Sequence, residues 1–212
     1  IIAIVIVVFG GLVIFGGNKK ENKSGSGKSN SSLSQNIQGS GSTGVVLVEY
    51  GDYQCPFCEQ YYPTVKAVSE QYKDQIKFQF RHFPLTNLHR NAFAASRAAQ
   101  AAALQNKFWE MHDALYDPAN NRAWTEASNP NPYFDQYAAT IGLNAAQFKK
   151  DFASSQVNDT INADMAEGNK LGITGTPSFF IDGKKTEIAN DLKAFQKVID
   201  ASIASKAAAK SN

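Results

Sequence analysis

Residues 45–63, VVLVEYGDYQCPFCEQYYP, carry the pattern that most strongly indicates the fold class. The first six of these residues are apolar and largely β-branched, which predicts a short buried strand. Residues 59–72 have the spacing of an amphipathic helix, in which Pro63 is expected to introduce a kink. Cys55 and Cys58 lie between these two elements, directly after the strand and at the start of the helix.

Cys55 and Cys58 are the only cysteines in the chain of 212 residues. Two cysteines are too few for a disulfide-stapled scaffold or a four-thiolate zinc site. A CxxC pair can also supply half of a mixed metal site. His82, His89 and His112 show no ligand spacing, however, and each is expected at the surface or at the edge of the core. No metal site is therefore predicted.

The position of the cysteine pair favours redox chemistry. A helix N-terminus presents unpaired N–H groups and a partial positive charge. A thiolate at Cys55 would accept those hydrogen bonds, which lowers its pKa below the free value of about 8.5. Pro56 suits the first helical turn, where the missing N–H costs nothing. Cys58, one turn further on, is expected to be less exposed and within disulfide distance of Cys55.

The remaining pattern predicts a mixed α/β domain. Residues 76–83 alternate as in a strand, and residues 178–181 and 186–188 are expected to form a hairpin around Asp182-Gly183. This order of elements indicates a βαβ unit and a ββα unit in one sheet. A helical insertion at about residues 85–155 separates them, within a folded domain of residues 45–206. Residues 207–212 are predicted to be a disordered tail. Helical spacing is found at residues 88–105, 107–116, 133–141, 145–152, 157–171 and 191–206.

The N-terminal region has a different character. Residues 1–17 (IIAIVIVVFGGLVIFGG) carry no charged or polar side chain, and as a helix they would span about 25 Å, which predicts a transmembrane anchor continued upstream. The alternative is a cleavable signal peptide. Against it, the run exceeds the usual apolar region of about 7–15 residues, and no Ala-x-Ala-like cleavage site follows. Residues 18–44 are rich in Ser, Gly and Asn, which predicts a flexible linker.

The charge pattern bears on partners and on orientation. The chain has 21 Lys and Arg against 19 Asp and Glu, a net charge of +2, without a dense basic block, which argues against nucleic-acid binding. Lys19, Lys20, Lys23 and Lys28 follow the apolar run, and the positive-inside rule places that side in the cytoplasm. Thiol oxidation favours the opposite side, so the orientation stays open at this stage.

The combined motifs resemble the thioredoxin fold. They are the strand, the Cys-Pro-x-Cys helix start, Pro63, and Gly175-Thr176-Pro177 before the hairpin. The insertion, the segment from Glu49 to Cys58, and residues 107–112 (KFWEMH) are similar to the DsbA family of extracytoplasmic thiol–disulfide oxidoreductases. Membrane-anchored members of Gram-positive and related bacteria look closest. The resemblance covers about residues 45–206 and implies a thioredoxin-like fold with a helical insertion between the βαβ and ββα units.

The resemblance also implies roles for single residues. Cys55 would be the attacking and leaving thiol, and Cys58 its buried partner. Thr176-Pro177 would be an X–cis-Pro loop that lies against the disulfide and pairs with an extended substrate, although an ordinary turn proline is the alternative. Together with Pro56 and Phe57, this loop is expected to bind substrate.

Glu49 would be the buried acid that relays a proton to or from Cys58, with a pKa raised by desolvation. The alternative is a strand-edge carboxylate in water. Phe57 departs from enteric DsbA, which has His at that position. Because Phe57 cannot supply a cation near the sulfur, a weaker oxidant is expected.

The expected function is a disulfide-donating oxidase. Its redox-active Cys55–Cys58 disulfide would need no other cofactor, and its substrates would be secreted or surface proteins with free thiols. The family implies reoxidation by a membrane quinone-linked partner (DsbB-like or VKOR-like). The expected location is the cell membrane, as a single-pass protein with the catalytic domain on the extracytoplasmic side. The alternatives are a reductase or isomerase with the same cysteines, and a non-enzymatic tethered binding or chaperone domain.

Overall fold

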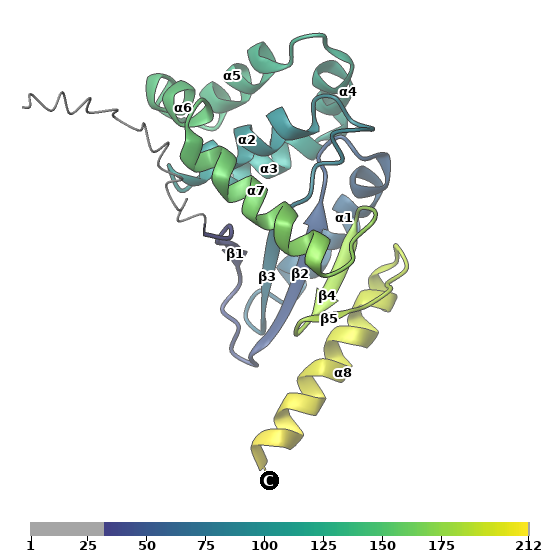
Figure 1. The fold of residues 1–212 in the computed structure, drawn as a ribbon. Coiled ribbons are helices and arrows are strands. Elements are labelled where there is room, and N and C mark those ends of the chain that lie inside the picture. Colours follow the sequence, from purple (N-terminus) through teal and green to yellow (C-terminus); the bar gives the residue numbers. More distant parts are fainter. Residues whose placement is uncertain (1–31, 212) are drawn as a thin grey trace, which may run out of the picture.

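A mixed five-stranded sheet forms the centre of the domain (Figure 1). The computed structural model describes residues 32–211, without the side chains of residues 121 and 122. The strand order is β1-β3-β2-β4-β5. The central strand β2 (Val45–Gly51) runs parallel to β3 (Ile76–His82) and antiparallel to β4 (Ser178–Ile181). The predicted βαβ and ββα units therefore share one sheet, and the predicted fold class is confirmed.

Helices cover both faces of the sheet because β2 is apolar on both. Val45 and Leu47 pack in one cluster with side chains of α1 (Pro56–Gln71) and α8 (Leu192–Ser211). Tyr50 packs on the opposite face, in a smaller cluster to which α7 (Ser155–Lys170) contributes. This arrangement leaves the carboxyl end of β2 and the start of α1 at one edge of the sheet.

Five helices form the insertion between β3 and α7, in the upper part of Figure 1. Four alanines on one side of α2, Ala95, Ala98, Ala99 and Ala102, have no exposed surface. Their small side chains let neighbouring helices approach α2 closely. The helices of the insertion are α2 (Ala92–Ala103), α3 (Phe108–Tyr116), α4 (Pro118–Glu126), α5 (Asn131–Thr140) and α6 (Ala145–Phe152).

The sequence did not predict α4. The Asp117 side chain caps this helix by accepting a hydrogen bond from Ala119 N–H (2.9 Å), and Pro118 occupies its first position. The second strand of the hairpin also differs from expectation. β5 is Lys184–Lys185 rather than residues 186–188, because Asp182 (φ 50°) and Gly183 (φ 80°) form a two-residue turn that pairs Ile181 directly with Lys184.

Part of the predicted flexible linker is ordered, which corrects the expectation for the end of residues 18–44. β1 (Asn36–Gln38) pairs antiparallel with β3. Just before it, Ser34 N–H donates to Asp164 Oδ1 (2.9 Å), and Arg81 Nη1 donates to the Ser34 carbonyl (2.7 Å). Arg81 also forms a buried ion pair with Asp164 (3.1 Å). Composition alone indicated a coil because these partners are distant in sequence.

The predicted tail is also corrected, since α8 runs to Ser211 and residues 207–211 are helical. This end of the chain is rich in alanine, the residue with the highest helix propensity. The predicted anchor at residues 1–17 and the linker up to residue 31 lie outside the described residues. Within residues 32–211, none of the helices combines the length and apolarity needed to cross a membrane.

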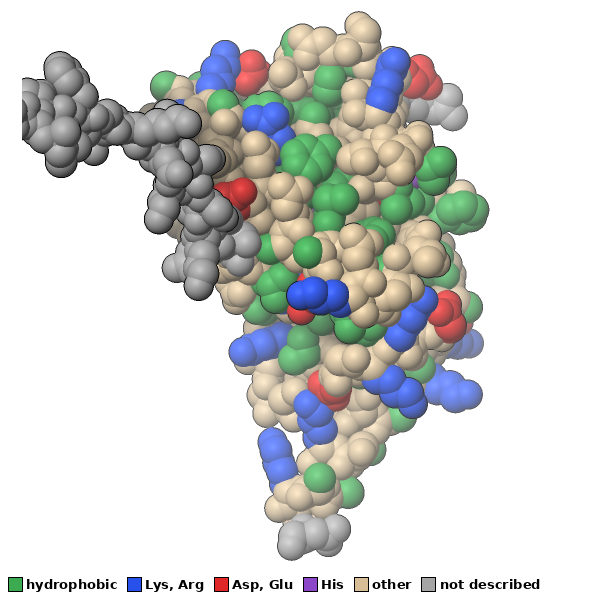
Figure 2. Space-filling model, viewed as in Figure 1, with side chains coloured by type: hydrophobic (Ala, Val, Ile, Leu, Met, Phe, Trp, Pro, Cys, Tyr) green, Lys and Arg blue, Asp and Glu red, His purple; other side chains and the backbone are tan. Residues whose placement is uncertain are grey.

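Charged side chains are spread over the face seen in Figure 2. Lys and Arg side chains on this face are separated by other side chains, and they do not merge into one continuous basic surface. The distribution agrees with the small net charge of the chain.

Candidate active site

The end of β2 places Cys55 at the N-terminus of α1. Cys55 has an extended backbone (φ −75°, ψ 122°) and is the N-cap residue, with Pro56 at the first helical position. Its N–H donates to the Asp52 carbonyl (3.1 Å), and its own carbonyl accepts from Glu59 N–H (3.1 Å). The Cys55 side chain therefore lies beside the free N–H groups of the first helical turn, as the sequence predicted.

Cys55 is stabilised as a thiolate. Its pKa is lowered to about 5, chiefly by a hydrogen bond from the Cys58 side chain. Burial opposes this effect, whereas the Thr176 side chain and the backbone N–H groups of Cys58 and Phe57 reinforce it. In the present structure both cysteines are free thiols, and Cys55 Sγ donates to the Thr176 carbonyl (3.3 Å). Because the pKa is about 5, the Cys55 sulfur is mainly a thiolate at neutral pH.

Cys58 has the opposite character. Only 1% of its surface is exposed. Burial raises the pKa of its thiol well above the ordinary value, and the hydrogen bond to Cys55 and the charge of Glu49 act in the same direction. The two sulfurs therefore differ, with one favouring the thiolate and the other the thiol.

The Thr176–Pro177 peptide bond is cis, as the sequence analysis expected. The loop lies against the cysteines because the Thr176 carbonyl accepts the hydrogen bond from Cys55. Thr176 Oγ1 is buried and has no hydrogen-bond partner among the described residues. This hydroxyl is available to donate to a Cys55 thiolate, which accounts for its effect on the Cys55 pKa.

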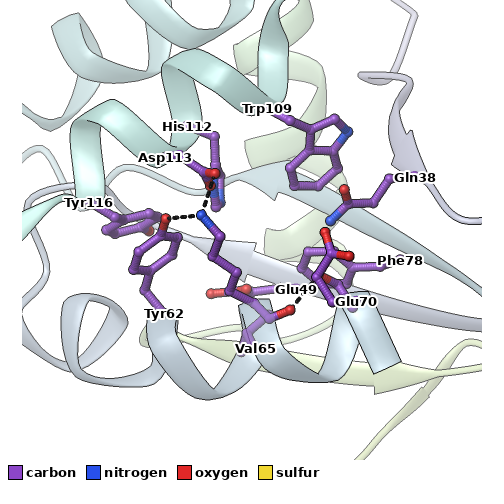
Figure 3. Close-up of a pocket in the computed structure, with 12 residues that line it drawn as sticks. Gln38, Glu49, Tyr62, Val65, Glu70, Phe78, Trp109, His112, Asp113 and Tyr116 are labelled. Atoms are coloured by element: carbon purple, nitrogen blue, oxygen red, sulfur yellow. Dashed lines mark hydrogen bonds and ion pairs between the residues drawn. The ribbon is translucent and has the colours of Figure 1, made fainter. Parts of the chain in front are cut away.

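Glu49 lies beneath the cysteines and not in water at a strand edge. Only 4% of its surface is exposed, and burial, followed by the charge of Cys55, raises its pKa to about 8. Figure 3 shows Glu49 at a cavity between α1 and α3, with Tyr62, His112 and Tyr116 in its wall. The cavity volume of about 40 Å³ exceeds the roughly 10–15 Å³ that one water molecule needs.

Polar groups surround this cavity. The half-exposed Lys66 Nζ donates to Asp113 Oδ2 (2.7 Å) and to the Tyr62 hydroxyl (3.2 Å). His112 Nε2 and the Tyr116 hydroxyl are buried without a hydrogen-bond partner among the described residues. Buried polar groups of this kind are normally satisfied by ordered water, and the cavity beside Glu49 has room for it.

A shallow groove of about 200 Å³ runs beside the cis-proline loop. Phe57, Tyr61, Pro177 and Ile188 line it, together with Thr176. The Phe57 ring is 63% exposed, the second most exposed large apolar side chain among residues 32–211. The structure thus brings Phe57, Thr176 and Pro177 together in one groove. Pro56 is exposed at the start of α1 but does not line this groove.

The expectation for the histidines is wrong for two of them. His82 and His112 are buried in the core, where burial lowers the pKa of both rings. His89 instead pairs with Asp52 (2.6 Å), a fully buried carboxylate in the turn before Cys55. Among residues 32–211, no three His, Cys, Asp or Glu side chains are grouped so that they could hold a metal ion.

Sequence reasoning missed Asp52 and Gln54. Asp52 Oδ1 accepts a hydrogen bond from Gln54 N–H (2.7 Å). In turns, an Asp side chain often accepts from the backbone N–H two residues later. That pattern was the available signal for Asp52. The partners of Gln54, Asn91 and Thr125, lie 37 and 71 positions further along the chain, so no local sequence pattern predicts them.

The comparisons with known proteins agree with this geometry. A family model described as "Thioredoxin" matches residues 31–201. A solved thioredoxin-like oxidoreductase from Silicibacter pomeroyi DSS-3 is 26% identical, with 78% of this chain and 90% of that chain covered and a TM-score of 0.65. The α-DsbA1 of Wolbachia pipientis is 23% identical, with coverage of 82% and 92% and a TM-score of 0.68. Oxidised BdbD from Bacillus subtilis is 18% identical, with coverage of 80% and 92% and a TM-score of 0.65.

Curated relatives are longer proteins. The Na(+)/H(+) antiporter NhaA 1 of Mycolicibacterium vanbaalenii is 36% identical over 141 residues, which are 66% of this chain and 22% of the antiporter. An NhaA 1 from Mycobacterium sp. strain KMS is 32% identical over 167 residues, 78% of this chain and 26% of that protein. This chain spans about a quarter of their length, so the antiport activity in their names is not carried over. The family match spans most of the chain, and the chain belongs to the thioredoxin family, as an oxidoreductase with the fold of the DsbA thiol–disulfide oxidoreductases.

Proposed function

We propose that this oxidoreductase donates disulfides to secreted or surface proteins outside the cytoplasm. The observation that carries the proposal is the difference between the two sulfurs. The pKa of Cys55 is lowered to about 5, whereas that of Cys58 is raised well above its ordinary value. A stabilised thiolate is a good leaving group and favours the reduced form of the pair, which makes the disulfide form an oxidant.

The reaction takes place in two exchange steps. A substrate thiolate attacks Cys55 Sγ of the Cys55–Cys58 disulfide, the bond between the two sulfurs breaks, and Cys58 leaves as a thiolate that takes up a proton. A second substrate thiolate then attacks the substrate sulfur of the mixed disulfide and expels the Cys55 thiolate. The substrate dithiol is oxidised to a disulfide, and the enzyme pair is reduced to a dithiol. The redox-active pair needs no further cofactor.

Glu49 supplies the proton for Cys58. Its pKa of about 8 keeps the carboxyl protonated at neutral pH, and its effect on the Cys58 pKa once it is ionised places it near that sulfur. The proton is given up as Cys58 becomes a thiolate and is replaced through the cavity beside Lys66 and Asp113. The alternative role of a plain structural carboxylate provides no reason for an unpaired carboxyl in the interior.

The substrate lies in the groove of Phe57, Tyr61 and Pro177. Its extended backbone pairs with the Thr176–Pro177 loop, and the exposed Phe57 ring contacts its apolar side chains. Such a groove suits unfolded or partly folded chains, which expose apolar side chains next to free thiols. Pro56 is exposed beside this path at the first turn of α1.

The proposed location is the outer side of the cell membrane, with residues 1–17 as the single-pass anchor. Its support is the uncharged apolar run and the oxidising chemistry. Tethering to the membrane would raise the effective concentration of a quinone-linked reoxidase (DsbB-like or VKOR-like) in the same membrane. A reductase or isomerase is the second candidate, because Phe57 provides no cation near the thiolate.

Equilibration with glutathione tests the direction of the reaction. We expect a reduction potential well above the value of about −270 mV that is typical of thioredoxin. A potential at or below that value would overturn the oxidase proposal in favour of the reductase.

A further inference from the structure

The turn that precedes the nucleophile is bonded to the helical insertion at two points. Asp52 Oδ2 accepts from Leu85 N–H (2.8 Å) and pairs with His89 Nδ1 (2.6 Å). Gln54 follows two residues later and precedes Cys55 directly. Its side chain also reaches the insertion, where it donates one hydrogen bond and accepts another. The Asp52 and Gln54 side chains of this turn are thus hydrogen-bonded to residues of the insertion and not to the sheet.

The Gln54 amide makes a two-point bridge. Its Nε2 donates to the Thr125 carbonyl at the end of α4 (2.9 Å), and its Oε1 accepts from Asn91 N–H just before α2 (2.7 Å). Asn91 Nδ2 in turn donates to the carbonyls of Trp124 (2.9 Å) and Ala127 (2.9 Å). The carbonyls at a helix C-terminus lack partners within the helix, so Gln54 and Asn91 together cap α4.

The position of Cys55 depends on this turn. Among the described residues, no side chain caps the N-terminus of α1. The orientation of the Cys55 backbone therefore relies on its own N–H bond to the Asp52 carbonyl (3.1 Å) and on the residue before it. The Cys55 sulfur must meet the N–H groups of Phe57 and Cys58 on one side and Thr176 on the other. Hydrogen bonds weaken steeply with misalignment, so a small rotation of this turn changes several contacts at once.

We propose that Gln54 is a positioning residue that ties the turn before the nucleophile to the helical insertion and thereby holds Cys55 Sγ in register with the N-terminus of α1 and with Thr176. The inference rests on the proposed thiol chemistry of Cys55. It assigns the insertion a part in setting the redox properties of the pair, because Asn91 and Thr125 both belong to it.

A matched pair of variants separates positioning from general stability. Gln105 makes the same kind of two-point bridge elsewhere in the insertion, where its Oε1 accepts from Asn144 N–H (2.9 Å) and its Nε2 donates to the Asn144 carbonyl (3.4 Å). Gln54→Met and Gln105→Met each remove two hydrogen bonds with little change of side-chain volume. Gln54 is next to Cys55 in the chain and Gln105 is not, so the second variant controls for the loss of the two hydrogen bonds alone.

The experiment measures two quantities in the reduced chain: the ionisation of Cys55, by absorbance at 240 nm, and the equilibrium with glutathione. We expect Gln54→Met to raise the Cys55 pKa by about one unit, a tenfold change in thiolate stability. The glutathione equilibrium should shift toward the enzyme disulfide. Gln105→Met should leave both quantities unchanged. Asn91→Ala removes the side chain that caps the end of α4 but keeps the backbone N–H that donates to Gln54, and it should shift the pKa in the same direction by less.

Three results would overturn the inference. One is a Gln54→Met protein that folds and keeps the wild-type pKa and equilibrium. Another is an equal shift in Gln105→Met. If Gln54→Met does not fold, an Asn91→Ala protein with the wild-type pKa has the same meaning. A wild-type Cys55 that titrates near the free value of about 8.5 would instead overturn the proposed function, and the inference with it.

Discussion

At the scale of single residues, the chemistry depends on how differently the two cysteine sulfurs are surrounded. Cys55 lies at a helix N-terminus against Thr176, and Cys58 lies one turn inside the protein above Glu49. The largest contribution to the low pKa of Cys55 is the hydrogen bond from Cys58. The pair therefore acts as a unit, and a change in one sulfur is felt by the other.

Cys58→Ala tests this dependence. The substitution removes the S–H donor to Cys55, so the pKa of Cys55 should rise from about 5 toward its ordinary value. Titration of the single remaining thiol by absorbance at 240 nm measures the shift. When the variant is given a substrate that already carries a disulfide, mixed disulfides should also accumulate, because the Cys55 thiolate attacks that bond and no second enzyme thiol is left to release the substrate. An unchanged pKa would show that the helix terminus and Thr176 act without Cys58.

Glu49→Gln tests the proton relay. The variant keeps the size of the side chain but cannot release a proton to Cys58. We expect attack on the enzyme disulfide to slow by roughly 10²-fold at neutral pH, a common contribution for a general acid. The ratio of the wild-type rate to the variant rate should fall as the pH rises and Glu49 loses its proton, because the growing fraction of substrate thiolate affects both proteins equally. Stopped-flow fluorescence gives both profiles, and two parallel profiles would exclude the relay.

The same carboxyl makes stability depend on pH. Below pH 4.5 Glu49 is protonated in the folded and unfolded chain, and between 4.5 and about 8 only the folded chain keeps its proton. The free energy of unfolding therefore falls as the pH rises through this window. Glu49→Gln should be more stable than wild type by a few kcal/mol at pH 9, and nearly equal to it at pH 4. Urea unfolding at both pH values checks this, and a constant difference would contradict it.

The candidate site was partly predictable from residues near each other in sequence. Cys55, Cys58 and the Thr176-Pro177 loop stand in short motifs, and the buried position of Glu49 was implied by the family resemblance, from its place six residues before Cys55. Asp52–His89 and the bonds of Gln54 were not predictable, because they join segments that only the tertiary fold brings together. The burial of His112 was missed for the same reason.

At the scale of elements, β1 is the main difference between expectation and structure. A strand of three residues in a Ser- and Gly-rich segment has no periodicity to recognise. It is held by the edge of β3 and by the buried Arg81–Asp164 pair. The helices with clear apolar spacing were predicted, and α4 was missed because its helix is short and its sequence polar.

Asp164→Ala tests what holds β1 in place. It removes the buried partner of the Arg81 guanidinium, which then keeps the longer contact with Glu167 (3.7 Å), and it removes the acceptor of the Ser34 and His82 N–H groups. Loss of one partner of a buried pair costs about 3–5 kcal/mol, measurable by urea unfolding. Faster hydrogen exchange in residues 34–38 should accompany it. The control is Asp135→Ala in the exposed pair with Lys149 (3.2 Å), expected to cost at most about 1 kcal/mol. Equal losses would contradict this role.

At the scale of the whole molecule, the helical insertion and the thioredoxin-like unit form one site. The sheet, α1 and the cis-proline loop supply the sulfur chemistry, while the insertion closes the Glu49 cavity and braces the turn before Cys55. This division explains why the order of elements predicted the fold class, whereas the contacts between the two parts required the structure.

Cys55→Ser distinguishes an enzyme from a non-enzymatic binding domain. The variant keeps the groove of Phe57, Tyr61 and Pro177 but loses the nucleophile. Oxidation of a reduced unfolded protein should fall to the uncatalysed rate. If catalysed oxidation is lost but the variant still suppresses aggregation of the unfolded protein as well as wild type does, the groove binds unfolded chains independently of the Cys55 sulfur. A variant that still promotes native disulfides would contradict the enzymatic assignment.

The most direct test of the central claim is the ionisation of Cys55 in the reduced wild-type chain, followed at 240 nm between pH 3 and pH 10. We expect a single thiolate transition near pH 5, with Cys58 still protonated at neutral pH. A first transition at about 8.5, the value of a free cysteine, would contradict it.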